Sequence, residues 1–171
     1  MGLIIKDKID SLMCGYPTVS DKYNVRGATL ASDSEIGHFG DITLIDGNGY
    51  FKVASATTTV TSADVVAGVL LATNVKLVTD IFGGSSAEAE TRPGEAFNLL
   101  VDGYVALPVD LTNSTATAEK AKIKEGTSAK ITSAGKVSPE GTIDCGWKFT
   151  GITTTVGSKL LAEVVVFKKN I

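Results

Sequence analysis

Short stretches of alternating apolar and polar residues, separated by turn residues, dominate the chain from residue 28 onward. This period of two is typical of strands with one buried face. The clearest example is IDGNGYFKV at 45–53, in which DGNG at 46–49 has the composition of a hairpin turn that needs positive φ angles. AFNLLVDGYVALPVDL at 96–111 alternates equally well, and its Asp102-Gly103 pair predicts a second hairpin turn.

Two further segments complete the predicted set of strands. VVAGVLLATNVKLV at 65–78 is almost continuously apolar, and its β-branched residues and Gly68 favour a buried strand over a helix. CGWKFTGITTTVGSKLLAEVVVF at 145–167 has strand residues on both sides of a glycine turn, which predicts a terminal hairpin. Alternation within this hairpin predicts that Trp147 and Phe149 face the core while Lys148 faces solvent.

The sequence therefore predicts an all-β fold, in which residues 27–171 form a β-barrel or jelly-roll-like domain. In this interpretation the terminal hairpin closes the barrel. After residue 26 we expect no helix longer than about two turns, because no segment has a sustained helical period. The stretch 112–136 is polar and rich in threonine and lysine, which is typical of weak strands and loops at a surface.

Residues 1–26 differ from the rest and are predicted to form an irregular N-terminal arm. They lack period-two alternation and carry charges every few positions. Their apolar residues are compatible with one or two short amphipathic helical turns, or with an arm that has no packing partner inside its own domain. A segment of this kind gains more by covering a partner protein, so the arm is a candidate interface. Its candidate contact residues are Leu3, Ile4, Ile5, Tyr16, Pro17, Tyr23 and Arg26.

Composition narrows the class of protein. The chain has 171 residues, 43% of them hydrophobic, which is enough for a core of ordinary size. A formal net charge of −3 argues against direct nucleic-acid binding, which needs a basic face. No apolar run approaches the length of about 20 residues that crosses a bilayer, and no secretory signal is visible, so we expect a soluble protein. Cys14 and Cys145 are too few and too far apart for a zinc site or a disulfide framework, which favours two free thiols in a reducing compartment.

The sequence offers little catalytic chemistry. His38 is the only histidine, and its neighbours Glu35 and Asp41 are expected in solvent-exposed turns. GGSS at 83–86 lacks the spacing of a phosphate-binding loop, and DGNG at 46–49 lacks the spacing of a calcium loop. Aspartates at predicted strand ends are explained by turn formation. We therefore expect no enzyme activity, no catalytic residue, no cofactor and no metal.

Read in order, four segments resemble the structural cement proteins that decorate the heads of tailed bacteriophages. They are IGHFGDI at 36–42, VVAGVLLATNV at 65–75, RPGEAFNLLVDGYVALPV at 92–109 and GWKFTGITTTVGSKLLAEVVV at 146–166. The last segment is the most specific. It is similar to the family's Gly-Trp-x-Phe motif, glycine turn, Leu-Ala pair and β-branched strand, here carried by Trp147, Phe149, Gly157, Leu160 and Ala162. Residues 1–13 and 112–136 show no such likeness.

The resemblance implies a non-enzymatic protein on the outer surface of a virion capsid, made in the host cytoplasm. Its implied partners are the major capsid protein and further copies of itself, as a dimer or trimer. An alternative from another class is a sugar- or receptor-binding β-module of a phage tail or fibre. The scarcity of aromatic residues argues against this alternative, because sugar sites use stacking aromatics and these residues are expected in the core. An enzyme of unusual design is a third possibility.

Overall fold

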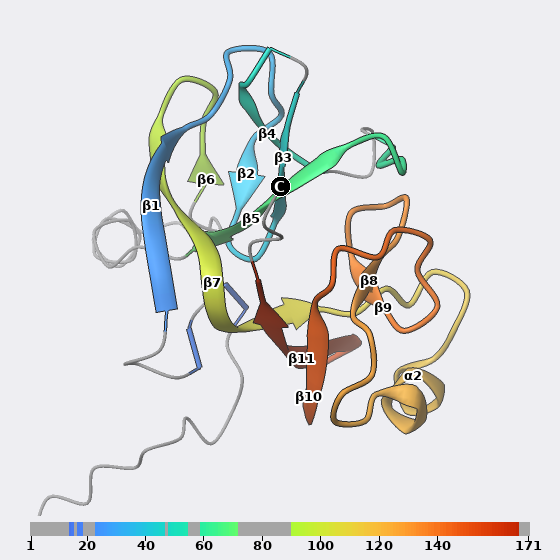
Figure 1. The fold of residues 1–171 in the computed structure, drawn as a ribbon. Coiled ribbons are helices and arrows are strands. Elements are labelled where there is room, and N and C mark those ends of the chain that lie inside the picture. The colour runs from blue at the N-terminus through green and yellow to red at the C-terminus, as the bar shows by residue number, and fades with distance from the viewer. Residues whose placement is uncertain are drawn as a thin grey trace, which may run out of the picture.

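The computed structural model describes residues 14, 15, 17, 18, 23–46, 48–54, 59–71 and 90–167. Within these ranges the chain is built mainly from antiparallel strands, with one helix of seven residues (Figure 1). The all-β prediction is confirmed. The elements are β1 (Tyr23–Thr29), β2 (Gly37–His38), β3 (Ile42–Ile45), β4 (Phe51–Val53), β5 (Val65–Leu71), β6 (Glu90–Thr91), β7 (Ala96–Pro108), α2 (Ala116–Lys122), β8 (Lys130–Ile131), β9 (Val137–Ser138), β10 (Lys148–Val156) and β11 (Lys159–Val166).

Seven strands form one sheet in the order β10-β11-β7-β5-β3-β4, and β1 also pairs with β7. The pairs β2-β6 and β8-β9 form two small sheets of their own. All of the strand pairings are antiparallel. In Figure 1 the strand β7 passes from the part of the molecule that contains β1–β6 to the part that contains β8–β11 and α2.

The described strands form no closed barrel, so the prediction that the terminal hairpin closes one is wrong. The sheet path begins at β10 and ends at β4, and these two strands are not paired. The base of β10 is covered by a loop in place of a strand. Gly126 N donates to Phe149 O at 2.9 Å, and Ala129 N donates to Trp147 O at 2.9 Å. The hairpin is therefore an edge of an open sheet.

The hairpin predicted at 46–49 is confirmed, whereas the one predicted at Asp102-Gly103 is wrong. Around the first turn β3 pairs with β4, and Asp46 N donates to Tyr50 O at 2.9 Å. At the second position β7 continues for 13 residues without a turn. A tight turn of the Asp-Gly type needs positive φ at both central residues, but only Gly103 has one, at 140°.

Gly103 instead marks the point at which β7 changes partners. Residues of β7 before it pair with β1 and β5, and residues after it pair with β11. Gly103 itself lies opposite both Tyr23 and Val166.

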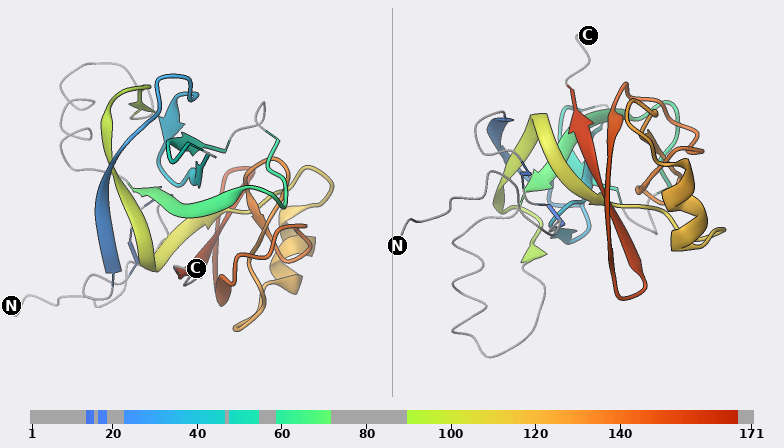
Figure 2. Two further views of the ribbon diagram at one scale, coloured as in Figure 1. Left: turned by 45° about the horizontal axis from the view of Figure 1, so that its top comes forward. Right: turned by 90° about the horizontal axis from the view of Figure 1, so that it is seen from below.

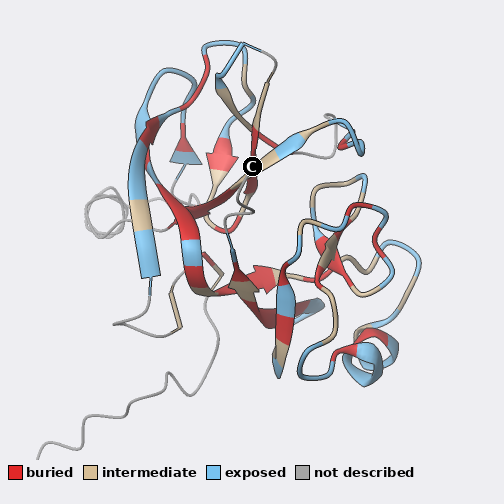
Figure 3. Cartoon of the chain, viewed as in Figure 1, coloured by how far each residue is buried: buried red, intermediate tan, exposed pale blue. Residues whose placement is uncertain are grey.

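The central strands of the large sheet are buried on both faces, and their period of two explains this. In β7, Leu100 and Leu107 belong to the larger core cluster, while Phe97 and Leu99 belong to a second cluster. Figure 3 shows β7 and β11 as mostly buried. The predicted strand at 65–78 is confirmed over β5; the remainder of that segment lies outside the described residues.

The stretch 112–136 is more ordered than predicted. It contains α2 and β8, and it contributes Ile123, Ala129 and Ile131 to the larger core. Thr115 begins the helix as its N-cap, because its side-chain oxygen accepts a hydrogen bond from Ala118 N at 3.2 Å. These three buried residues are separated by polar residues in the sequence, so no apolar pattern predicts them.

The terminal hairpin packs as predicted at its base. Trp147 and Phe149 are each 1% exposed, while Lys148 between them is exposed. The indole Nε1 of Trp147 donates to Phe167 O at 3.2 Å, so the buried ring also has its polar atom satisfied.

Replacing Trp147 by alanine is expected to destabilise the fold by about 3–5 kcal/mol, because it leaves a large cavity in the main core. Thermal or urea unfolding measures this change. Lys148→Ala, at the next position of the chain, is the matched control and should change stability by less than about 0.5 kcal/mol. A Trp147→Ala melt within a degree or two of wild type would contradict the packing described here.

Candidate interaction surfaces

The described part of the predicted arm lies along the chain's own β7. Gly15 N donates to Ala106 O and Thr18 N donates to Tyr104 O, both at 3.0 Å. Residues 23–26 are the first four residues of β1, which pairs with β7 from Gly103 to Ala96. For these residues, the expectation of an arm without a partner in its own domain is wrong. The physical reason is that β7 offers unpaired backbone groups along this edge, which the N-terminal residues satisfy.

The predicted contact residues of the arm therefore differ in how far the structure exposes them. Tyr23 and Arg26 lie on β1 with exposed side chains, and Tyr23 is 48% exposed. Pro17 forms an isolated bridge with Val105 and is half-buried. Leu3, Ile4, Ile5 and Tyr16 lie outside the described residues.

Aromatic residues meet at a shallow hollow beside the start of β1. Tyr23, Tyr104 and Phe167 line it, together with Asn24 and Asp102, around a volume of about 360 Å³. The register explains the meeting, because Tyr23 and Val166 both lie opposite Gly103 in the sheet. The sequence predicts aromatic residues in the core and carries no local signal for this group, which only long-range strand pairing brings together.

His38 lies between two carboxylates on the small β2-β6 sheet. Its Nδ1 is 3.6 Å from Asp41 Oδ2, and its Nε2 is 3.8 Å from Glu90 Oε1. The histidine side chain is 41% exposed, so water competes for both contacts. Asp41 also accepts the backbone N–H of His38 at 2.7 Å, which makes it a turn-forming residue. Glu35 does not join this group; its carbonyl accepts from Ser34 Oγ.

The group around His38 does not form a metal centre. Within the part of the chain that the structure describes, no three or more His, Cys, Asp or Glu side chains are arranged to hold a metal ion. Cys14 is half-buried, and its Sγ donates to Phe39 O at 3.1 Å, while Cys145 packs against the larger core.

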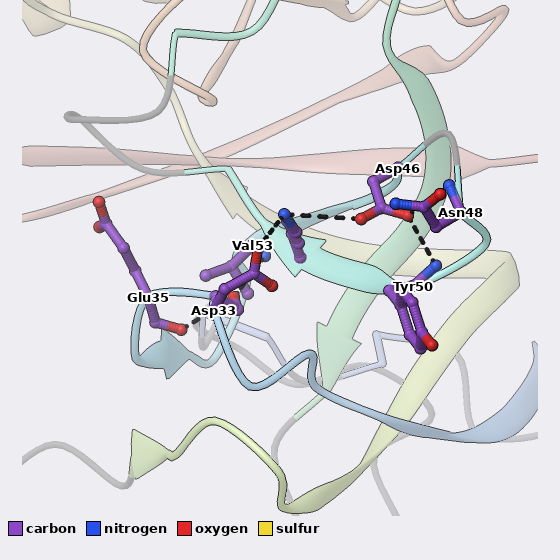
Figure 4. Close-up of polar contacts among 8 residues, drawn as sticks. Asp33, Glu35, Asp46, Asn48, Tyr50 and Val53 are labelled. Atoms are coloured by element: carbon purple, nitrogen blue, oxygen red, sulfur yellow. Dashed lines mark hydrogen bonds and ion pairs between the residues drawn. The ribbon is translucent and has the colours of Figure 1, made fainter.

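A lysine joins the β3-β4 turn to the segment that precedes β2, and Figure 4 labels the two aspartates that it contacts, Asp33 and Asp46. Lys52 Nζ lies 2.6 Å from Asp33 Oδ2 and 3.5 Å from Asp46 Oδ2. Asp46 Oδ1 accepts the backbone N–H groups of Asn48 and Tyr50, each at 2.9 Å. The hydrogen bond from the Tyr50 N–H is the main reason that the pKa of Asp46 is lowered. The hydrogen bond from Lys52 to Asp33 is the main reason that the pKa of Lys52 is raised.

A second polar group fixes α2 to the turn after β9. Lys122 Nζ contacts Glu140 Oε2 at 2.9 Å and Glu119 Oε1 at 3.0 Å, and these bonds raise the pKa of Lys122. Glu119 is 2% exposed, and its Oε2 has no hydrogen-bond partner. These three residues line a polar cavity of about 340 Å³ together with Asp110.

Hydrogen bonds lower the pKa of Asp110, which lines this cavity. Burial by itself raises the pKa of its carboxyl, but hydrogen bonds from Thr112 and Thr132 outweigh burial and leave the pKa below its usual range. Sequence reasoning explained Asp110 as a strand-end residue and did not single out Glu119. The cavity depends on residues from 110 to 142 folding back on one another, which no local pattern specifies.

The Asp46 turn predicts a pH-dependent stability. A carboxyl whose pKa is lower in the folded state stabilises the fold above its unfolded pKa of about 4, and this contribution is lost as the pH falls through the folded pKa. Asp46→Asn should therefore melt below wild type at neutral pH, and the difference should shrink on acidification. Thermal melts across a pH series measure this, with exposed Asp102→Asn as the control for loss of one charge. A difference that persists unchanged through the acid range would contradict the assignment.

No protein-family model matches the chain, and no curated protein sequence matches it. No helix among the described residues is long and apolar enough to span a bilayer.

Proposed function

We propose that the protein is a non-enzymatic structural protein that binds the outer surface of a phage capsid. It stabilises the shell by bridging subunits of the major capsid protein, and it associates with further copies of itself as a dimer or trimer. It acts on the virion after synthesis in the host cytoplasm, without direct contact with nucleic acid or membrane.

The observation that carries the proposal is the structure of the segment with the most specific likeness to cement proteins. Trp147 and Phe149 are each 1% exposed, as is Leu160, and Ala162 is fully buried. Gly157 occupies the turn between β10 and β11 with φ of 59°. Four of the five residues that carry the resemblance are thus buried at one hairpin and the fifth forms its turn, which supports treating them as one structural unit.

The fold suits a brace for physical reasons. A shell becomes harder to open when an added protein spans two or more subunits, because opening must then break additional interfaces. Standard interfaces bury roughly 1,200–2,000 Å² in total, and a bivalent brace gains further from effective concentration. A sheet that is buried on both faces transmits load without a mobile element.

The predicted arm residues are the proposed contact with the capsid protein. Of those that the structure describes, Tyr23 and Arg26 present exposed side chains on β1. An exposed tyrosine and arginine are residue types enriched at the energetic centres of interfaces. The net charge of −3 also limits stray adhesion to the packaged genome.

Particles that carry the protein are expected to release their genome at a higher temperature than particles stripped of it. A fluorescent dye that reports released nucleic acid, followed during heating, measures the difference. Adding the purified protein back to stripped particles should restore the higher temperature, whereas the double variant Tyr23→Ala/Arg26→Glu should restore it less. Equal release temperatures for decorated and stripped particles would contradict the bracing role.

The aromatic hollow favours a second candidate function, a sugar- or receptor-binding module of a tail or fibre. Tyr23, Tyr104 and Phe167 beside Asn24 and Asp102 combine apolar ring surface with hydrogen-bonding groups, which is the combination that small-molecule sites use. This alternative requires that the isolated protein binds a glycan array and that Tyr23→Ala abolishes the binding. Bracing requires neither result.

A further inference from the structure

The polar cavity beside α2 is bounded by segments that fold back on one another. Its volume is about 340 Å³, which is in the range of small-molecule sites. One wall is α2, and the loops that follow β7, β8 and β9 form the others. Both views of Figure 2 show α2 and the segment around β8 and β9 side by side at one end of the molecule. Several elements therefore hold the shape of the cavity.

A buried carboxylate of this cavity has one oxygen unpaired. Glu119 is 2% exposed, and its Oε1 lies 3.0 Å from Lys122 Nζ. Its Oε2 is buried and has no hydrogen-bond partner within the part of the chain that the structure describes. A buried polar atom without a partner costs free energy, and an ionised carboxylate is satisfied only by a donor. The cavity thus contains a strong acceptor that its own side chains do not use.

The charges around the cavity favour a cation as the ligand. Asp110, Glu119 and Glu140 contribute three carboxylates to the lining, and Lys122 contributes an ammonium. Lys136 also acts electrostatically on Asp110. Three carboxylates against two lysines leave one negative charge unbalanced, so a ligand with a single positive charge would neutralise the group.

The arrangement of acceptors favours an ammonium over a guanidinium. Glu119 Oε1 and Glu140 Oε2 are both bonded to Lys122, and Asp110 Oδ1 accepts from Thr112 N at 2.9 Å. A guanidinium binds best to a carboxylate that presents both oxygens to its parallel N–H groups. An ammonium needs only separate acceptors, because its three donors point in different directions. Serine and threonine hydroxyls, which make up much of the remaining lining, supply further acceptors.

We propose that this cavity binds the primary ammonium group of an aliphatic amine, with the carboxylate of Glu119 as the principal acceptor. Asp110 and Glu140 add negative charge around the bound group. The amine belongs either to a free small molecule or to a lysine side chain on a protein surface, because both present the same binding group. The inference goes beyond the bracing role and does not depend on it.

Lys122 controls access to Glu119. The Lys122 side chain is 39% exposed, and it contacts the exposed Glu140 at 2.9 Å as well as the buried Glu119. When Lys122 turns toward Glu140 alone, an incoming ammonium takes its place and donates to both oxygens of Glu119. The exchange keeps the buried charge paired and also satisfies Oε2.

An NMR titration of the isotope-labelled full-length protein with n-butylamine, at neutral pH and fixed ionic strength, tests the site. The amide signals of Thr112 and Glu119 should shift saturably with a dissociation constant of about 1 mM. The uncharged n-butanol should leave these signals in place. The amides of Asn48 and Tyr50, which donate to Asp46, are the internal control for an ammonium acting at any carboxylate.

Two variants change the affinity in opposite directions. Glu119→Gln keeps the shape of the side chain without its charge and should weaken n-butylamine binding by about tenfold. Lys122→Met removes the competing ammonium and should tighten binding by about threefold or more, an effect that a purely structural lysine would not have. Glu163→Gln changes another buried glutamate, on β11 and outside the lining, and should leave the affinity unchanged. Thermal melts establish that each variant is folded.

N-acetyl-lysine methylamide and N-acetyl-arginine methylamide distinguish the sources of the amine. Binding of the lysine derivative as tight as that of n-butylamine identifies a protein side chain, whereas binding of n-butylamine alone identifies a free amine. An arginine derivative that binds more tightly than both would overturn the ammonium assignment. Shifts that do not saturate, equal shifts with n-butanol, or unchanged affinity in Glu119→Gln or Lys122→Met would overturn the site. None of these results depends on particles, so the bracing role remains separately testable.

Discussion

The structure depends on the continuity of β7 through Gly103. A strand of 13 residues is long for a protein of this size, and its two halves pair with different strands. Before Gly103 its alternate side chains enter the two larger core clusters, and after Gly103 Val105 and Leu107 enter the first of these while Ala106 packs with Leu161 on the other face. The N-terminal segment, β5 and the terminal hairpin all take their positions from this one strand. A break at Gly103 would separate the sheet into two parts, neither of which buries its apolar residues alone.

The same position shows how far the sequence predicts the fold. The turn residues at 46–49 and at 102–103 look alike in composition, yet only the first forms a hairpin. Local chemistry identifies residues that tolerate a turn, whereas burial of the flanking residues decides whether the turn forms. Val101 and Val105 are both buried in the continuous strand, and a hairpin at Asp102 would remove them from those contacts. The inward positions of Trp147 and Phe149 were predictable because strict alternation needs no long-range information.

The candidate surfaces were less predictable for the same reason. Glu90 meets His38 only because β6 pairs with β2, and Tyr23 meets Phe167 only because β1 and β11 share β7. No spacing in the chain encodes either meeting. The arm also illustrates this limit, because its low periodicity gives no sign of the pairing of Tyr23–Arg26 with β7. Unsatisfied backbone on a central strand attracts a nearby segment whatever its side-chain pattern.

The contrast between the two sides of the terminal hairpin links fold to function. On β11, Leu160, Ala162 and Val164 are almost fully buried, so this strand is constrained by the core. On β10 beyond Gly151, no core contact requires the side chains to be threonine, isoleucine and valine, and no charge interrupts them. An uncharged, β-prone edge of this kind is an aggregation hazard unless it is covered. Strand propensity accounts for the β-branched residues of β10, but it does not account for the absence of a charge or proline that would protect the edge.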